Sequence, residues 1–268
     1  MIYSFISWNV NPEIFHIGPI AVRWYGLLFA SAFFFGYLIM ARVFNKENIP
    51  QPLLDKLTLY MALGTIIGAR LGHCLFYEPA YYLANPLEIL FIWHGGLASH
   101  GAAVGIIISL YIFSKKTKHS FLWILDRIVI VIALSGFFIR IGNLMNSEIV
   151  GKATNLPWGF IFVRDFELRG SPRHPTQIYE ALVCLIIFGI LLLWYKKNYN
   201  NKVHGFAFSL FLITLFVFRF LIEYIKDVQV NFENKMILDM GQILSIPFIL
   251  IGVIIMVMYY KQLKVKSE

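Results

Sequence analysis

The sequence predicts an all-α integral membrane protein with seven transmembrane helices. Of its 268 residues, 59% are hydrophobic and only 14% are charged, whereas a soluble domain carries about a quarter charged residues. Apolar runs long enough to cross a bilayer, roughly 20 residues each, recur along the chain. The basic residues fall in short runs between them, so the net charge of +8 indicates membrane topology and not nucleic-acid binding.

Seven apolar runs define the expected spans. They lie at about 21–43, 57–77, 88–113, 122–143, 177–195, 204–225 and 238–260. The third run is the least regular, because four glycines between 95 and 105 interrupt it. There is no internal repeat and no cleavable leader pattern, so we expect one transmembrane domain over residues 1–268 whose first span directs insertion.

Lysine and arginine counts set the expected orientation. Twelve basic residues flank one set of helix ends and seven flank the other, which predicts the N-terminus outside and the C-terminus inside. The inner set is Arg42, Lys46, Lys56, Lys115, Lys116, Lys118, Lys196, Lys197, Lys202, Lys261, Lys264 and Lys266. The outer set is Arg23, Lys152, Arg164, Arg169, Arg173, Lys226 and Lys235.

The only long connection, residues 144–176, joins the fourth and fifth expected spans on the outer side. Several prolines and glycines argue against another span there. Ordered loops of this length are more often functional than not. We therefore expect residues 144–176 to form an ordered structure outside the membrane, an extracytoplasmic head. Trp158, Phe160 and Phe162 are expected to rest at the membrane interface.

Four arginines lie within or at the ends of spans. Arg127 is near the inner end of its span and can extend to the surface, so it is assigned a structural role. Arg70, Arg140 and Arg219 lie about 20–27 Å from the inner face at the rise of a helix. An intramembrane arginine near the bilayer centre costs about 2.5–3.5 kcal/mol to insert, which favours a function for Arg140 and Arg219.

These arginines suggest an anion site. Guanidinium groups match phosphate oxygens and stay charged, so Arg140 and Arg219, read as unpartnered, predict a site for a phospholipid or phosphorylated ligand near the outer leaflet. Glu223 follows Arg219 by one helical turn and could pair with it. For Arg70 and Glu223, structural and functional roles are equally weighted.

His100 adds the possibility of proton transfer. It lies in a glycine-rich stretch, and an intramembrane histidine must find partners at some cost. The alternative is a helix-packing face, because Gly101 and Gly105 form a GxxxG pattern. His73 and His174 are weaker candidates. Cys74 and Cys184 are read as small buried side chains, and no cofactor or metal site is expected.

Three segments together resemble the prolipoprotein diacylglyceryl transferase family. Residues 140–151, R-I-G-N-L-M-N-S-E-I-V-G, are similar to the signature G-R-x-G-N-F-x-N-x-E-x-x-G. Ile139 and Leu144 depart from it, both as apolar residues outside the polar set. Residues 95–101 resemble G-G-x-x-x-H-G, and residues 173–180 resemble R-H-P-[ST]-Q-x-Y-E.

Shorter matches run from about residue 20 to residue 250. They are Arg23-Trp24-Tyr25-Gly26, Arg219-Phe220-Leu221-Ile222-Glu223 and Gly241-Gln242-Ile243-Leu244-Ser245. Leu215 stands where relatives often carry a tyrosine, so this chain has no hydroxyl at that position.

The resemblance implies an enzyme of the bacterial inner membrane whose active site faces the outer leaflet. Such enzymes transfer the diacylglyceryl group of phosphatidylglycerol to the lipobox cysteine of a preprolipoprotein signal peptide and release glycerol 1-phosphate. His100, Arg140 and Arg219 would be catalytic. Substrate binding would involve Arg140, Asn143, Asn146, Glu148, Gly151, Tyr25 and Glu223.

Three alternative functions fit the sequence less well. A transporter could use the same arginines, but the sequence lacks the usual repeat symmetry. An intramembrane serine protease would need Ser99 to face His100, and adjacent helical residues do not face each other. A purely structural membrane protein would not need arginines in the outer half of the bilayer.

Overall fold

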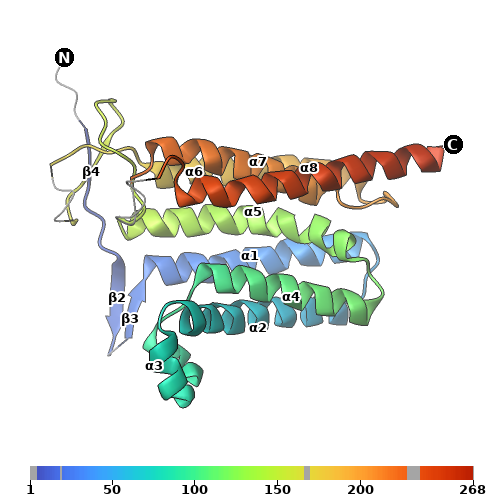
Figure 1. Cartoon of the computed structure of the whole chain (residues 1–268), viewed down its shortest axis with the longest axis horizontal. Coiled ribbons are helices and arrows are strands. Elements are labelled where there is room, and N and C mark those ends of the chain that lie inside the picture. The colour runs from blue at the N-terminus through green and yellow to red at the C-terminus, as the bar shows by residue number, and fades with distance from the viewer. Residues whose placement is uncertain (1–4, 19, 166–169, 228–235, 268) are drawn as a thin grey trace. The chain divides into compact units, whose positions relative to one another are not determined.

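The computed structural model describes residues 5–18, 20–165, 170–227 and 236–267, and helices dominate it (Figure 1). The α-helices are α1 Trp24–Lys46, α2 Gln51–Phe76, α3 Pro79–Ala84, α4 Ser99–Thr117, α5 Phe121–Met145, α6 Thr176–Asn198, α7 Phe206–Ile222 and α8 Met240–Ser267. The strands are β1 Ile6–Trp8, β2 Glu13–Ile17, β3 Ile20–Arg23 and β4 Phe160–Phe162. Short 3-10 turns are η1 Pro86–Leu90, η2 Ile92–His94 and η3 Glu223–Ile225. Arg169 and Lys235, counted above for the orientation, lie outside the described residues.

Six of the described helices are long and apolar enough to cross a membrane: α1, α2, α5, α6, α7 with its 3-10 extension, and α8. The chain is therefore a multi-pass membrane protein. The third expected span differs most from the structure, because its helix, α4, begins only at Ser99. Residues 86–94 form 3-10 turns instead, and Gly95 and Gly96 take positive φ angles that end any helix there.

The chain separates into two compact units, which are described separately. The smaller unit, Met40–Ile124, is built on a close pairing of α2 with α4. A Cβ added to Gly101 would lie 2.2 Å from the Gly68 carbonyl oxygen, and one added to Gly105 would lie 2.1 Å from that of Gly64. Glycine is thus required on both helices, and the helix-packing role weighed for Gly101 and Gly105 is confirmed.

Arg70 anchors the segment between α2 and α4. Its side chain is buried and donates hydrogen bonds to the carbonyl oxygens of Glu88, Ile89, Gly95 and Gly96. The guanidinium also lies over the ring of Tyr82. Four backbone acceptors occupy most of its donors, so the structure favours the structural role for Arg70.

The larger unit, Met1–Ile39 with Leu125–Glu268, carries a small β structure at one end. Strand β1 pairs in parallel with β4 from the 144–176 connection, and the indole of Trp8 donates to the carbonyl oxygen of Leu144 at 3.0 Å. Phe160 and Phe162 are buried in an apolar cluster with Leu144 and Val150, against which Trp8 and Ile178 pack. The expected interfacial placement of these two rings is therefore wrong, while Trp158 remains exposed. The apolar surroundings of the two rings come from other residues of the protein, whereas the sequence led us to expect lipid.

Buried polar residues fix the opposite end of this unit. Asp126 on α5 accepts hydrogen bonds from the backbone N–H groups of Gly205 and Phe208, at 2.6 and 2.9 Å, and so caps the start of α7. Arg127 is also buried, and its Nη2 lies 3.4 Å from the Tyr199 carbonyl oxygen. The expected extension of Arg127 to the surface is therefore wrong, because its side chain is held inside the unit; its structural role stays a prediction.

Candidate functional site

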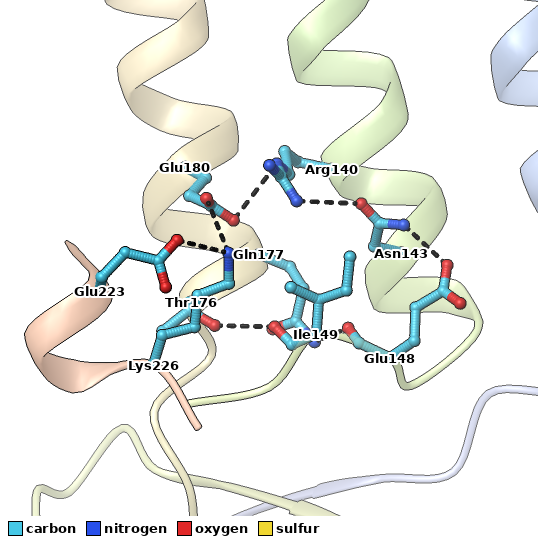
Figure 2. Close-up of polar contacts among 9 residues, drawn as sticks. All are labelled: Arg140, Asn143, Glu148, Ile149, Thr176, Gln177, Glu180, Glu223 and Lys226. Atoms are coloured by element: carbon cyan, nitrogen blue, oxygen red, sulfur yellow. Dashed lines mark hydrogen bonds and ion pairs between the residues drawn. The ribbon is translucent and has the colours of Figure 1, made fainter. Parts of the chain in front are cut away.

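A polar layer lies in the larger unit where α5 and α7 end and α6 begins (Figure 2). Side chains from α5, from the turn after it, from α6, and from η3 and the residue that follows it point toward one another. The charged and amide side chains of this polar layer are Arg140, Asn143, Asn146, Glu148, Glu180, Glu223 and Lys226. They alternate in charge, which is how charged groups are accommodated away from water. This layer contains most of the site residues that the sequence singled out.

Arg140 is held by two neighbours. Its Nε lies 3.2 Å from Oε2 of Glu180, and its Nη1 donates to Oδ1 of Asn143 at 3.4 Å. The expectation that Arg140 is unpartnered is therefore wrong, because α6 brings a carboxylate that the sequence did not link to it. Within the described part of the chain Nη2 makes no hydrogen bond, so one edge of the guanidinium remains available to an anion.

Asn143 extends this chain of contacts to the turn after α5. Its Nδ2 donates to Oε1 of Glu148 at 2.7 Å, and Nδ2 of Asn146 reaches the same oxygen at 3.3 Å. Glu148 thus collects two amide donors and fixes which way Asn143 presents its oxygen to Arg140. The structure brings Arg140, Asn143, Asn146 and Glu148 together, as the motif led us to expect.

The turn that carries Glu148 is strained. Ser147 and Ile149 have φ angles of 57° and 59°, a left-handed conformation that a β-branched residue rarely adopts. The first residues of α6 hold it there, since Oγ1 of Thr176 donates to the Ile149 carbonyl oxygen at 2.9 Å and Nε2 of Gln177 donates to that of Glu148 at 2.6 Å. Such strain persists only where the surroundings impose it, and it is common at functional sites.

A buried lysine on the other side of Glu180 was not predicted. Nζ of Lys226 lies 3.6 Å from Oε1 of Glu180 and 3.4 Å from Oε1 of Glu223, and its side chain is 4% exposed. Lys226 had been counted only among the outer basic residues. Its spacing of three residues from Glu223 was the one available signal, and nothing in the sequence joined either residue to Glu180.

Arg219 differs from Arg140. Its side chain is half-buried, and among the described residues it forms no hydrogen bond or ion pair. The suggested Arg219–Glu223 pair is not formed, because Glu223 turns to Lys226. A Cβ on Gly241 would lie 2.2 Å from Oε1 of Glu223, so the start of α8 also closes on that carboxylate. Arg219 is thus a guanidinium with its donors unused, one helical turn from the polar layer.

Tyr25 packs against the backbone of the same motif. A Cβ on Gly142 would lie 2.8 Å from Cδ2 of the Tyr25 ring. The glycine therefore lets the ring of Tyr25 on α1 lie directly against α5, at a position that is between Arg140 and Asn143 in the sequence. This contact gives a physical reason for the glycine in the R-x-G-N segment.

Gly151 lies where two backbones cross. A Cβ there would be 2.6 Å from Cβ of His174 and 2.8 Å from the Ile225 carbonyl oxygen, so this position supports the head rather than offering a side chain. Next to it, Nδ1 of His174 lies 3.4 Å from the Tyr179 hydroxyl, which accepts a hydrogen bond from Trp158 at 2.9 Å. Burial lowers the pKa of His174, which favours the neutral ring at neutral pH.

His100 and His73 belong to the smaller unit. His100 is the second residue of α4, is exposed, and has no hydrogen-bond partner among the residues that the structure describes. His73 is stacked on Tyr77, with ring centroids 5.7 Å apart, and packs against Gly96. The catalytic role of His100 stays a prediction. Over the described ranges, no three His, Cys, Asp or Glu side chains are placed to share a metal ion.

Comparison with known proteins agrees with the motifs. A family described as "Prolipoprotein diacylglyceryl transferase" matches residues 12–258. The chain is 46% identical to the phosphatidylglycerol–prolipoprotein diacylglyceryl transferase of Tolumonas auensis, over 96% of this chain and 98% of the relative. It is 45% identical to that of Chloroherpeton thalassium, over 98% of both chains. With a match that covers all the segments of the polar layer, the chain belongs to the prolipoprotein diacylglyceryl transferase family.

Proposed function

We propose that this protein transfers the diacylglyceryl group of phosphatidylglycerol to the thiol of a lipobox cysteine in a preprolipoprotein signal peptide, and that glycerol 1-phosphate is released. Family membership supports the reaction class. The observation that carries the assignment in this chain is the pair of half-buried guanidiniums, Arg140 with one free edge and Arg219 with its donors unused. Both suit a phosphodiester.

The reaction needs a thiolate and a stabilised leaving group. A cysteine thiol has an ordinary pKa near 8.5, so His100 takes its proton or supports the group that does. The sulfur then forms a bond to the glycerol carbon of the lipid, and the carbon–oxygen bond to phosphate breaks with its electron pair staying on oxygen. Arg140 and Arg219 stabilise the charge that develops on this phosphate.

The remaining residues orient these groups. Asn143, Asn146 and Glu148 fix the direction of the Arg140 side chain and meet the lipid headgroup. Tyr25 on α1 and Glu223 on η3 line the lipid headgroup site on two sides. Gly151 shapes the backbone of the head beside that site.

We place the site toward the outer leaflet of a bacterial inner membrane, in a single transmembrane domain with residues 144–176 as an extracytoplasmic head. Helix α4 completes seven spans in this proposal, because it packs along α2 over Gly101 and Gly105. The N-terminus is outside and the C-terminus is cytoplasmic, as the distribution of basic residues indicates.

The test uses purified protein in vesicles that contain phosphatidylglycerol, with a synthetic signal-peptide fragment bearing one cysteine. Mass spectrometry should show the peptide gaining one diacylglyceryl unit and glycerol 1-phosphate appearing in equal amount. A peptide with serine in place of cysteine should gain nothing. A folded protein that binds the lipid but leaves the peptide unmodified would refute the transfer and favour transport of the lipid.

The base is tested separately. His100→Ala should lower turnover and shift its pH dependence, because thiolate formation would then rely on solvent. Near-normal turnover of His100→Ala would remove the base assignment and leave the arginine roles standing.

A further inference from the structure

We propose that Lys226 is a positioning residue for the lipid phosphate site. It holds the carboxylate of Glu180 partly away from Arg140, so that Arg140 keeps a free donor edge and enough positive charge to bind the phosphodiester. This inference rests on the transfer reaction proposed above. It assigns a specific task to a lysine that touches neither the motif arginines nor, in this proposal, the substrate.

The geometry of Glu180 carries the argument (Figure 2). Its two oxygens face different cations: Oε1 lies 3.6 Å from Nζ of Lys226, and Oε2 lies 3.2 Å from Nε of Arg140. The Oε2 contact is an ion pair without a hydrogen bond, since this buried oxygen has no hydrogen-bond partner among the described residues. Glu180 is thus shared between two cations and is not locked to Arg140 by the paired hydrogen bonds that guanidinium and carboxylate can form.

Burial makes the sharing consequential. The side chains of Lys226 and Glu180 are 4% and 6% exposed, so water does little to screen their charges. A buried carboxylate that loses one of its two cations interacts more strongly with the remaining one. Without Lys226, Glu180 would turn fully toward Arg140, occupy its donors and compete with the phosphate for the same guanidinium.

Glu223 keeps Lys226 in place for this task. Oε1 of Glu223 lies 3.4 Å from Nζ of Lys226 and balances the charge of the lysine, while Nζ still contacts Glu180. The backbone of Lys226 is fixed independently of its side chain, through a bridge to Gly151 and a hydrogen bond from the Lys152 N–H to the Ile225 carbonyl oxygen at 2.8 Å. Changing the side chain of Lys226 therefore leaves the attachment of this segment to the head intact.

The test measures the apparent KM for phosphatidylglycerol, as a mole fraction in mixed micelles, beside the KM for the peptide. Lys226→Met should raise the lipid KM about tenfold, a usual size for coupling between linked sites, and leave the peptide KM unchanged. Lys226→Arg should keep the lipid KM close to that of the wild type. Lys152→Met is the matched control, because this nearby lysine is exposed and, among the described residues, the one hydrogen bond of its Nζ is to the backbone carbonyl oxygen of Tyr224.

The double variant Lys226→Met/Glu180→Gln separates positioning from packing. It should recover much of the lipid affinity lost in Lys226→Met, since the competing charge is gone. An unchanged lipid KM in Lys226→Met would overturn the proposal. So would a double variant no better than Lys226→Met, or an effect equal to that of Lys152→Met. Transfer by the wild type with these outcomes leaves the proposed function intact, whereas failure of the wild type to transfer overturns both.

Discussion

At the scale of single residues, the site combines two arginines in different electrostatic settings. Arg140 is the first member of an alternating series that continues through Glu180 and Lys226 to Glu223. Arg219 lies one turn before that series and is not part of it. In the proposed reaction, therefore, the first arginine both stabilises the structure and binds the lipid phosphate, whereas the second only binds the phosphate.

Neutralising each arginine should consequently have different effects on stability. Arg140→Gln leaves Glu180 with a weaker set of partners and should lower the free energy of unfolding by about 1–3 kcal/mol. Arg219→Gln removes a half-buried charge without a partner among the described residues and should leave that free energy unchanged or raised. Both should reduce kcat/KM by about 100-fold or more, the usual effect of losing one donor to a developing charge.

The measurement combines unfolding in mixed micelles with the peptide assay. Arg140→Lys and Arg219→Lys serve as charge-conserving controls, and both should remain poor enzymes because the planar fork is lost. Equal destabilisation by Arg140→Gln and Arg219→Gln would contradict the difference in their surroundings.

Gly142 offers a second test at this scale. In Gly142→Ala the new methyl group would lie 2.8 Å from the Tyr25 ring, which forces the ring or α5 to move. We expect a loss of activity on the order of 10- to 100-fold, since small displacements near a reacting group are costly. Gly36→Ala on α1 is the control, because its methyl group would make only an ordinary contact, 3.7 Å from Val131. Similar activity in both variants would show that the Tyr25 contact is unimportant.

The motif residues of the site could be predicted, but their partners could not. Arg140, Asn143, Asn146 and Glu148 lie within nine consecutive residues, so the sequence places them together without knowledge of the fold. Glu180 and Lys226 come from distant segments, and only the packing of α6 and η3 against α5 brings their charges to Arg140. A lone carboxylate and a lone lysine near helix ends look like ordinary surface residues in sequence.

At the scale of elements, the helices lie where the apolar runs predicted them, except where prolines or glycines interrupt the run. Hydrophobicity alone located α1, α2, α5, α6, α7 and α8, because a lipid-facing helix needs little else. The run expected at 88–113 is also apolar, but the paired glycines at 95 and 96 divide it, and Pro86 begins a 3-10 turn just before it. Arg70 binds backbone carbonyls on both sides of this break. The short strands β1 and β4 were missed because each has only three residues and pairs with a distant segment.

The α2–α4 contact supplies the prediction for this scale. Gly101→Ala should destabilise the protein by about 1–3 kcal/mol, the usual cost of overpacking, because the methyl group meets the backbone of Gly68 and Gly72 at 2.2–2.7 Å. Gly189→Ala on α6 is the matched control, since nothing lies within 4 Å of its added Cβ. It should be neutral or slightly stabilising, because alanine favours helix over glycine. The midpoints of thermal unfolding in one detergent would compare the two, and equal midpoints would refute close packing of α2 on α4.

At the scale of the whole molecule, charge distribution and site position support one orientation. The strands β1 and β4 and the helix ends that carry the polar layer lie at one end of the larger unit, while the C-terminal end of α8 lies at the other (Figure 1). Arg219 is in the last turn of α7, next to the polar layer. Within this unit, the basic residues at the end of α6 and in the last turns of α8, Lys196, Lys197, Lys261 and Lys264, lie toward the second end, which the positive-inside rule assigns to the cytoplasm. The lipid phosphate site would then open where a translocated signal peptide presents its cysteine.

Cysteine accessibility in cells tests this orientation directly. Cys74 and Cys184 are both buried and can be replaced by alanine to give a background without thiols. Single cysteines at the exposed positions Asn11 and Lys152 should react with a membrane-impermeant maleimide in intact cells. Those at the exposed positions Asn200 and Gln262 should react only after permeabilisation. The reverse pattern would place Arg140 and Arg219 beside the inner leaflet, where a cysteine already carried across the membrane could not reach a lipid bound by them, and the proposed transfer would have to be abandoned.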